Sequence, residues 1–165
     1  MTERRQATDD EARALASALR LRILRICLDD GRTNQEIAQI LGRDPASILH
    51  HIRTLVRTGF LEPQEERRGT RGAREIPYRA TRKSWRLSTP ARDRAMLDTF
   101  LEEVALVPVA DLDMSRLGLR LTEAGWAEFR DRLQDLLEEF AGRPDDPAAA
   151  AWSLFVALHP DPNRP

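Results

Sequence analysis

Residues 33–61 read TNQEIAQILGRDPASILHHIRTLVRTGFL, and their pattern of caps, turns and apolar residues predicts the central part of the fold. Its first part predicts a short helix that Asn34 caps and Gly42 ends, because these residue types suit helix starts and left-handed helix ends. Asp44 and Pro45 then serve as N-cap and first residue of the next helix, since proline fits the first helical position. Two helices joined by so short a turn predict a helix-turn-helix, although a generic helical hairpin has a similar turn.

The second of these helices is expected from Pro45 to about Thr58, with Gly59 as its C-cap. Apolar residues recur on one side at helical spacing and predict the buried face, which consists of Ile48, Ile52, Leu55 and Val56. The opposite face displays small and polar residues, namely Ala46, Ser47, His50, Arg53, Thr54 and Arg57. The preceding helix contributes an apolar face of Ile37, Ala38 and Leu41.

A longer helix is predicted upstream, from Asp9 to Leu28. Thr8 can cap it, and its acidic first turn suits the positive end of the helix dipole. The apolar stripe consists of Leu15, Leu19, Ile23 and Ile26, widened by Leu24, Cys27 and Leu28. Residues 29–31, Asp-Asp-Gly, end this helix before the helix-turn-helix begins.

A basic hairpin is predicted downstream. Residues 60–62 begin a strand and residues 75–81 form its return, with RRGTRGAR at 67–74 between them. The two glycines of this connection permit the positive φ angles of a hairpin tip. Four arginines have no packing use at such a tip, whereas a probe lying along nucleic-acid phosphates needs cations. The alternative is a disordered basic loop.

Charge is divided unevenly along the chain. Residues 43–94 hold thirteen Lys/Arg against six Asp/Glu, and residues 95–165 hold six against fourteen, although the whole chain carries a net charge of −1. A phosphate-binding protein needs a basic face and not a basic total, so this division is compatible with a nucleic-acid partner. A basic surface that only solvates the fold remains the alternative.

Three classes of protein are not expected. No run of residues is long and apolar enough to span a bilayer, and residues 1–6 lack the apolar segment of a secretion signal. The single cysteine, Cys27, can form neither an internal disulfide nor a multi-cysteine zinc site. We therefore expect a cytoplasmic protein with no membrane partner, no metal site and no cofactor.

The order helix, helix-turn-helix and basic wing resembles the ArsR-like winged helix-turn-helix regulators. The resemblance covers residues 9–83 and rests on ALRLRIL at 18–24, TNQEIA at 33–38 and SILHHIRTLVRTGFL at 47–61. It implies a sequence-specific, DNA-binding transcriptional regulator that acts as a homodimeric repressor. Metal-sensing members often carry paired cysteines or terminal acid and histidine ligands, which this chain lacks. A non-metal-sensing, actinobacterial-looking subgroup is therefore implied.

The residues expected at double-stranded DNA follow from this arrangement. The exposed face of the recognition helix would lie in the major groove, which nominates Ser47, His50, Arg53, Thr54 and Arg57. The start of the preceding helix is suited to phosphate, which nominates Thr33, Asn34 and Gln35. The wing nominates Arg67, Arg68, Arg71 and Arg74, with Lys83 and Arg86 as weaker candidates. His51 lies nearer the core and is expected to be structural or to contact phosphate.

The acidic remainder is expected to begin with a helix over residues 90–107. Alternating leucines predict a strand over 114–122, and a continuous apolar run predicts another over 152–158. A helix from Thr122 to Ala141 lies between them. The expected fold class is therefore mainly α with small β, a winged helix-turn-helix domain followed by a helix and a small α+β (β-α-β) unit.

The domain boundaries follow from these elements. Residues 1–8 are expected to form a flexible N-terminus, 9–83 the DNA-binding domain and 84–107 a linker and dimerisation helix. Residues 108–165 are expected to form an acidic unit for dimerisation or effector binding. Its tryptophans and that of the linker, Trp85, Trp126 and Trp152, are expected to fill cores, with a pocket for a small-molecule effector as the alternative.

Two functions from different classes remain open from the sequence. One is an operator-binding dimer, and the other is a protein-interaction adaptor whose winged helix does not bind DNA. An enzyme is not expected, because the chain shows no Gly-rich phosphate loop, no paired-ligand motif and no nucleophile with an adjacent base.

Overall fold

The computed structural model of the chain describes residues 5–69, 74–88, 90–144, 146 and 148–162. The chain divides into two compact units, Thr2–Leu106 and Val107–Pro165, called here the N-terminal unit and the C-terminal unit. Within the described residues, no helix combines the length and the apolar character that a bilayer crossing requires.

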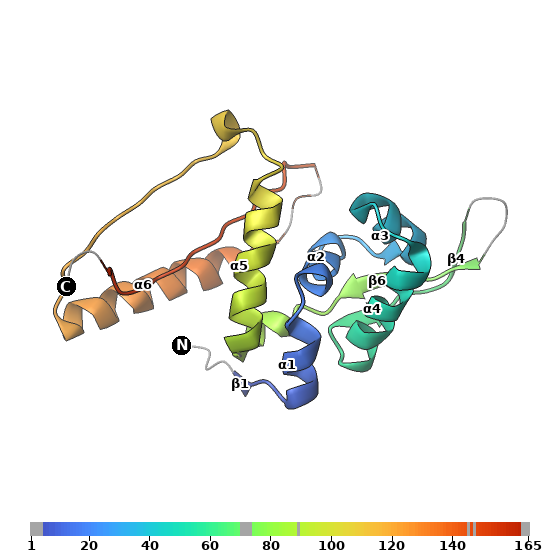
Figure 1. Ribbon diagram of the computed structural model, residues 1–165, viewed down its shortest axis with the longest axis horizontal. Coiled ribbons are helices and arrows are strands. Elements are labelled where there is room, and N and C mark those ends of the chain that lie inside the picture. Colours follow the sequence, from blue (N-terminus) through green and yellow to red (C-terminus); the bar gives the residue numbers. More distant parts are fainter. Residues whose placement is uncertain (1–4, 70–73, 89, 145, 147, 163–165) are drawn as a thin grey trace. The chain divides into compact units, whose positions relative to one another are not determined.

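The N-terminal unit consists of helices with short strands between them (Figure 1). Its helices are α1 (Asp9–Leu15), α2 (Ala18–Ile26), α3 (Asn34–Leu41), α4 (Pro45–Arg57), the 3-10 helix η2 (Lys83–Arg86) and α5 (Pro90–Val104). Its strands are β1 (Arg5–Gln6), β2 (Arg32–Thr33), β3 (Leu61–Pro63), β4 (Arg67–Arg68), β5 (Arg74–Glu75), β6 (Pro77–Ala80) and β7 (Leu87–Ser88). The predicted helices of the helix-turn-helix are confirmed by α3 and α4.

The prediction of one helix from Asp9 to Leu28 is wrong, because the chain breaks between α1 and α2. Ser17 adopts an extended conformation, and its hydroxyl accepts a hydrogen bond from the Arg20 amide, so it starts a new helix. The Arg20 guanidinium donates to the Ala14 carbonyl at 2.5 Å, which satisfies a carbonyl at the end of α1. The apolar stripe alone could not reveal this break, because both helices bury residues from it.

The caps of the helix-turn-helix explain where its helices start and end. Thr33, and not the predicted Asn34, is the N-cap of α3, because Thr33 and Glu36 form a reciprocal capping box. Gly42 ends α3 in the left-handed conformation at φ 60°, as predicted. Asp44 caps α4 by accepting from the Ser47 amide, also as predicted.

The predicted wing is confirmed by two paired sets of strands. β2, β6 and β3 form a three-stranded antiparallel sheet in that order, in which Leu61 lies opposite Ala80. β4 and β5 extend the hairpin, with Arg68 opposite Arg74. A separate parallel pair joins β1 to β7, so the predicted flexible N-terminus contributes a strand from Arg5 onward.

The core of the N-terminal unit lies among α1, α2, α3, α4 and the sheet. Ile48, Ile52 and Leu55 of α4 are fully buried, and Phe60, just after the end of that helix, is buried in the same core. α5 packs against α1 and α2 through Ala95 and Met96, so this helix belongs to the same core. Together the helix-turn-helix and its hairpin make this unit a winged helix-turn-helix fold.

The C-terminal unit contains the 3-10 helix η3 (Val109–Asp111) and the helix α6 (Glu123–Ala141). The predicted strands over 114–122 and 152–158 are wrong, because neither segment forms a ladder in the described residues. A strand is stable only when its backbone groups have a partner, and alternating leucines supply none. No described residue of this unit is buried, so the predicted β-α-β core is not formed either.

The three tryptophans are exposed, which contradicts the expectation that they fill cores. Trp85 is 45% exposed, Trp126 37% and Trp152 88%. Trp126 stacks on Phe129 of its own helix at 5.8 Å between ring centroids, which covers part of its ring. Aromatic composition alone could not distinguish these positions, because burial depends on a second surface that the chain has to supply.

Candidate nucleic-acid interface

The exposed face of α4 carries the residues that sequence analysis nominated for base contacts. Burial of Ile48, Ile52 and Leu55 fixes the rotation of the helix and leaves the opposite side exposed. That side presents the exposed residues Ala46, Ser47, His50, Arg53 and Arg57. Among the described residues, no carboxylate forms an ion pair with Arg53 or Arg57, so both guanidinium groups are available to a ligand.

Thr54 differs from its neighbours on this face. It is half-buried, and its hydroxyl donates to the His50 carbonyl one turn earlier, at 3.2 Å. A hydroxyl used in this way supplies a weaker contact to a ligand than the free groups beside it. The structure therefore brings Thr54 to the edge of the α4 face and not to its centre.

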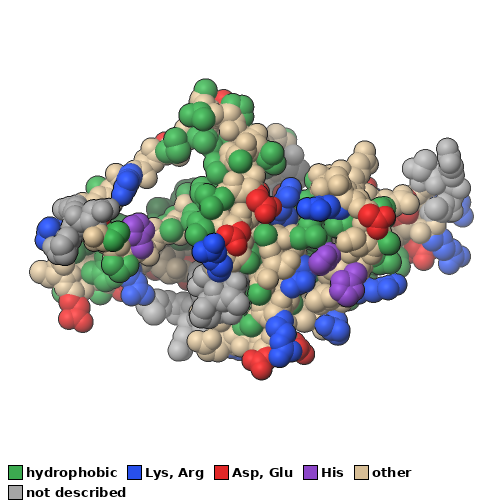
Figure 2. Space-filling model, in the orientation of Figure 1, with side chains coloured by type: hydrophobic (Ala, Val, Ile, Leu, Met, Phe, Trp, Pro, Cys, Tyr) green, Lys and Arg blue, Asp and Glu red, His purple; other side chains and the backbone are tan. Residues whose placement is uncertain are grey.

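Figure 2 shows histidine side chains beside lysine and arginine side chains over the helix-turn-helix. The His50 and His51 rings lie at 5.7 Å in an edge-to-face arrangement, with His50 exposed and His51 half-buried. Burial, with smaller effects from Arg20 and His50, lowers the pKa of His51. Burial thus disfavours the charged form of the His51 imidazole.

Most polar side chains at the start of α3 are used in hydrogen bonds that cap α3 or join it to α4. Thr33 is buried and its hydroxyl caps the helix, while the Asn34 amide donates to the Pro45 carbonyl at the first residue of α4. Gln35 is exposed. Of the three nominated side chains, only Gln35 is presented freely to solvent, and the other two set the geometry of the turn.

The wing arginines differ in whether their guanidinium groups are paired with carboxylates. Arg67 pairs with Glu36 of α3 at 2.6 Å, and Arg74 pairs with Glu66 at 3.2 Å. Arg68 is exposed and forms no ion pair with any described residue. Arg71 lies outside the described residues. The root of the wing is thus tied to the helix-turn-helix, which sequence reasoning did not foresee.

The Glu36 carboxylate is the group in α3 that pairs with Arg67 of the wing. Burial opposes its ionisation, but hydrogen bonds from the Thr33 amide and the Arg67 guanidinium outweigh burial and lower the pKa of Glu36. Glu36 is therefore ionised at neutral pH and holds Arg67 electrostatically. An acidic residue three positions after a threonine is the capping-box signal that could have located this group.

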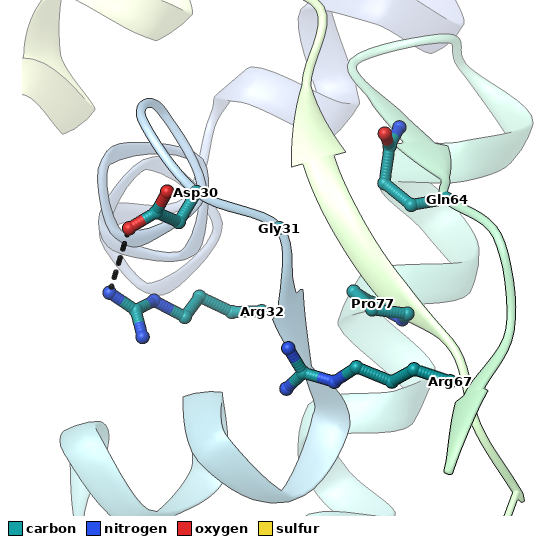
Figure 3. A pocket seen from close by; sticks show the side chains of 6 residues that line it. All are labelled: Asp30, Gly31, Arg32, Gln64, Arg67 and Pro77. Carbon is teal, nitrogen blue, oxygen red and sulfur yellow. Dashed lines mark ion pairs between the residues drawn. The ribbon is translucent and has the colours of Figure 1, made fainter.

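A shallow groove of about 380 Å³ lies between β2 and the wing, lined by Asp30, Gly31, Arg32, Gln64, Arg67 and Pro77. Figure 3 shows Arg67 reaching from the wing toward β2, while Arg32 points toward Asp30 and pairs with it at 3.6 Å. Both guanidinium groups of the groove are thus paired with carboxylates. No tryptophan lines it, so it does not correspond to the tryptophan-lined effector pocket considered from the sequence.

Lys83 is turned inward, unlike the phosphate contact that the sequence suggested as a weaker candidate. Its ammonium group donates to the Thr58 carbonyl at 2.7 Å and pairs with Glu11 at 2.8 Å. Arg86, the other weaker candidate, is exposed in η2. Among the described residues, no cluster of three or more His, Cys, Asp or Glu side chains is arranged for a metal ion.

Residues 15–64, from the end of α1 to the start of the wing, match a family described as "Helix-turn-helix domain". These residues form a helix-turn-helix domain. A comparison with curated proteins finds no match.

Similar solved structures include reduced HlyU from Vibrio cholerae, with 24% identity over 54% of this chain and 81% of that chain and a TM-score of 0.37. Lactococcus lactis ZitR has 23% identity over 78% and 86% of the two chains and a TM-score of 0.36. An S. aureus MepR–DNA complex has 16% identity over 81% and 80%, with a TM-score of 0.30.

Proposed function

We propose that the chain is a sequence-specific DNA-binding transcription regulator. The observation that carries this proposal is the rotation of α4, whose buried side is fixed by three fully buried residues. The opposite side then presents Ser47, His50 and Arg53 together, with no carboxylate paired to the arginine among the described residues. A helix that exposes such a face fits the major groove, where base edges offer acceptors to arginine.

The contacts divide into base-reading and phosphate-holding groups. Ser47, His50 and Arg53 are assigned to bases because they occupy the N-terminal and middle turns of α4, which usually meet the base edges. Arg57 and Arg68 are assigned to phosphates, together with Gln35 at the start of α3. Arg71 is assigned to phosphate from the sequence alone.

Arg67 and Arg74 have a smaller share in this assignment, because each already holds a carboxylate. A phosphate has to compete with Glu36 for Arg67, and the exchange of one anion for another gains less than the pairing of a free cation. We therefore assign Arg67 mainly to anchoring the wing. The nominated Thr33 and Asn34 side chains are assigned to the geometry of the turn between α3 and α4. Thr54, whose hydroxyl bonds within α4, is assigned a lesser part in DNA contact.

The finer assignment is an ArsR-like, homodimeric repressor that acts in the cytoplasm on a double-stranded operator. Leu97 and Leu101 of α5 are exposed, at 37% and 54%, and support the use of α5 as a dimerisation helix. A symmetric dimer would bind two half-sites centred about 34 Å apart. The proposal also includes a small-molecule effector that binds the C-terminal unit and regulates the protein.

Selection of bound sequences from a random DNA pool tests this assignment. The variant Arg53→Ala should change the selected motif, whereas Arg68→Ala should weaken binding to every sequence about equally. Arg13→Ala, which removes an exposed charge from α1, is the matched control and should do neither.

A titration of the selected DNA against salt completes the test. If about six cations per dimer engage phosphates, the plot of log K against log salt should have a slope of about −5. An adaptor that does not bind DNA would show little binding and no steep slope. That outcome would overturn the proposed function.

A further inference from the structure

Backbone hydrogen bonds close the C-terminal end of α4, and the carbonyls just after the helix need other donors. The Phe60 amide donates to the Leu55 carbonyl and the Gly59 amide donates to the Val56 carbonyl, with Gly59 at φ 74°. This is the Schellman pattern, in which a left-handed glycine closes a helix. The pattern does not satisfy the carbonyls of the three residues that follow the helix, Thr58, Gly59 and Phe60.

The segment that follows the wing satisfies all three of these carbonyls. The Thr81 hydroxyl donates to the Gly59 carbonyl at 2.8 Å, and the Thr81 amide donates to the Phe60 carbonyl at 3.0 Å. The Lys83 ammonium group donates to the Thr58 carbonyl at 2.7 Å. Because a helix C-terminus carries partial negative charge, the Lys83 cation is favoured there by the helix dipole as well.

The Lys83 side chain is held in this place from its other side. Glu11 of α1 pairs with the same ammonium group at 2.8 Å and with Arg5 at 2.8 Å, and its side chain is only 8% exposed. The Lys83 ammonium also lies 5.2 Å from the centroid of the Phe60 ring. Lys83 therefore joins α1, the end of α4 and the segment after the wing at one point.

We infer that Lys83 is a positioning residue for DNA recognition, which sets the angle of α4 relative to the wing and does not itself contact phosphate. The inference rests on the proposed function, since α4 and the wing have to meet the same duplex. A helix end tied to the segment after β6 cannot tilt without moving the wing. Glu11 acts through Lys83 by holding the ammonium group in place.

The effect of Glu11→Gln on DNA binding separates this inference from simple electrostatics. Loss of an acidic charge should strengthen DNA binding if only charge matters, and the exposed Glu65→Gln is the control that measures that effect. If Glu11 acts by positioning Lys83, Glu11→Gln should instead weaken binding about tenfold. Stronger binding by Glu11→Gln, matching that of Glu65→Gln, would overturn the inference.

The salt dependence of binding by Lys83→Met gives a second measure. A lost phosphate contact lowers the salt slope by about 1, as expected for Arg68→Gln, whereas a lost positioning contact leaves the slope at the wild-type value. The double variant that combines Glu11→Gln with Lys83→Met should bind DNA no more weakly than Lys83→Met alone, because Glu11 acts through Lys83. A reduced slope for Lys83→Met would assign it to phosphate and overturn the inference.

Hydrogen exchange in the full chain keeps this test separate from that of the proposed function. The amides of Thr58, Gly59 and Phe60 should exchange several-fold faster in Lys83→Met and in Glu11→Gln, while the Ser47 amide at the other end of α4 is unchanged. Failure of the wild-type chain to bind DNA, with these amides responding, would overturn the proposed function and leave Lys83 as a structural cap. Unchanged exchange at all three amides would overturn the inference itself.

Discussion

The helices α4 and α6 carry the same local signals and have different surroundings. Asp44 caps one and Thr122 caps the other, and both helices have an apolar stripe at helical spacing. The inward residues of α4 are 0% exposed, whereas Leu136 and Phe140 of α6 are 51% and 56% exposed. Caps and periodicity therefore determine that a helix forms, but burial requires a second surface. Among the described residues, the N-terminal unit supplies such a surface and the C-terminal unit does not.

The largest expected difference between the two units comes from shortening one aromatic side chain in each. Phe60→Ala removes a fully buried ring and should lower the free energy of unfolding by about 3–5 kcal/mol. Phe140→Ala removes a ring that is 56% exposed and should cost less than about 1 kcal/mol. Urea unfolding of the full chain measures both. Equal losses would show that α6 is buried in solution and would break the comparison.

The next largest difference concerns acidic residues in ion pairs. Hydrogen bonding to Arg5 first, and then to Lys83 and the Thr8 amide, lowers the pKa of Glu11 far below its ordinary value of 4.5, against the effect of burial. A lowered folded-state pKa contributes stability that is present above the unfolded-state pKa and lost as pH falls. Glu11→Gln should therefore be less stable than the wild type by about 2 kcal/mol at neutral pH.

This difference should shrink as the pH falls below about 4.5, because the unfolded chain then takes up a proton that the folded-state carboxylate, with its lower pKa, does not. The matched control is Glu128→Gln on α6, where an exposed carboxylate pairs with Arg132 at 3.5 Å. That change should alter the free energy of unfolding by less than about 0.5 kcal/mol at any pH. Thermal unfolding at several values between about pH 3 and pH 7 measures both stability differences. A difference between Glu11→Gln and the wild type that does not change with pH would contradict the lowered pKa of Glu11.

The smallest difference should come from the two threonine caps. The Thr33 hydroxyl accepts from the Glu36 amide at 3.2 Å, and the Thr122 hydroxyl accepts from the Gly125 amide at 3.1 Å. Thr33→Ala should lower global stability by about 1 kcal/mol, because α3 unfolds with the core. Thr122→Ala should leave the global transition unchanged and lower only the helix content of α6, which circular dichroism measures. A shared shift of the transition would show that the units unfold together.

Much of the N-terminal unit could be predicted because its signals are local. Gly42 and Pro45 mark a turn whatever surrounds them, and the spacing of Ile48 and Ile52 defines the buried side of α4. The same spacing located the exposed face that carries His50 and Arg53, so the geometry of the recognition helix follows from its core. The break at Ser17 was missed, because two helices in one apolar stripe give the same periodicity as one.

The partners of the basic residues could not be predicted, because they come from distant parts of the chain. Arg67 meets Glu36 across thirty-one positions, and Lys83 meets Glu11 across a still longer separation. A count of cations along the wing treats all of them alike. The distances divide them into cations available to a ligand, such as Arg53, and cations that hold the fold together.

The helix-turn-helix, the wing that follows it and the outward face of α4 could all be predicted from the amino-acid sequence alone. These depend on caps, turns and the period of apolar residues, which act over a few positions. The inward position of Lys83 at Thr58 and the lack of a strand over residues 114–122 follow instead from contacts between distant parts of the chain. Both outcomes depend on which distant groups meet, because an ammonium group or a strand edge is stable only beside the partner that the fold provides.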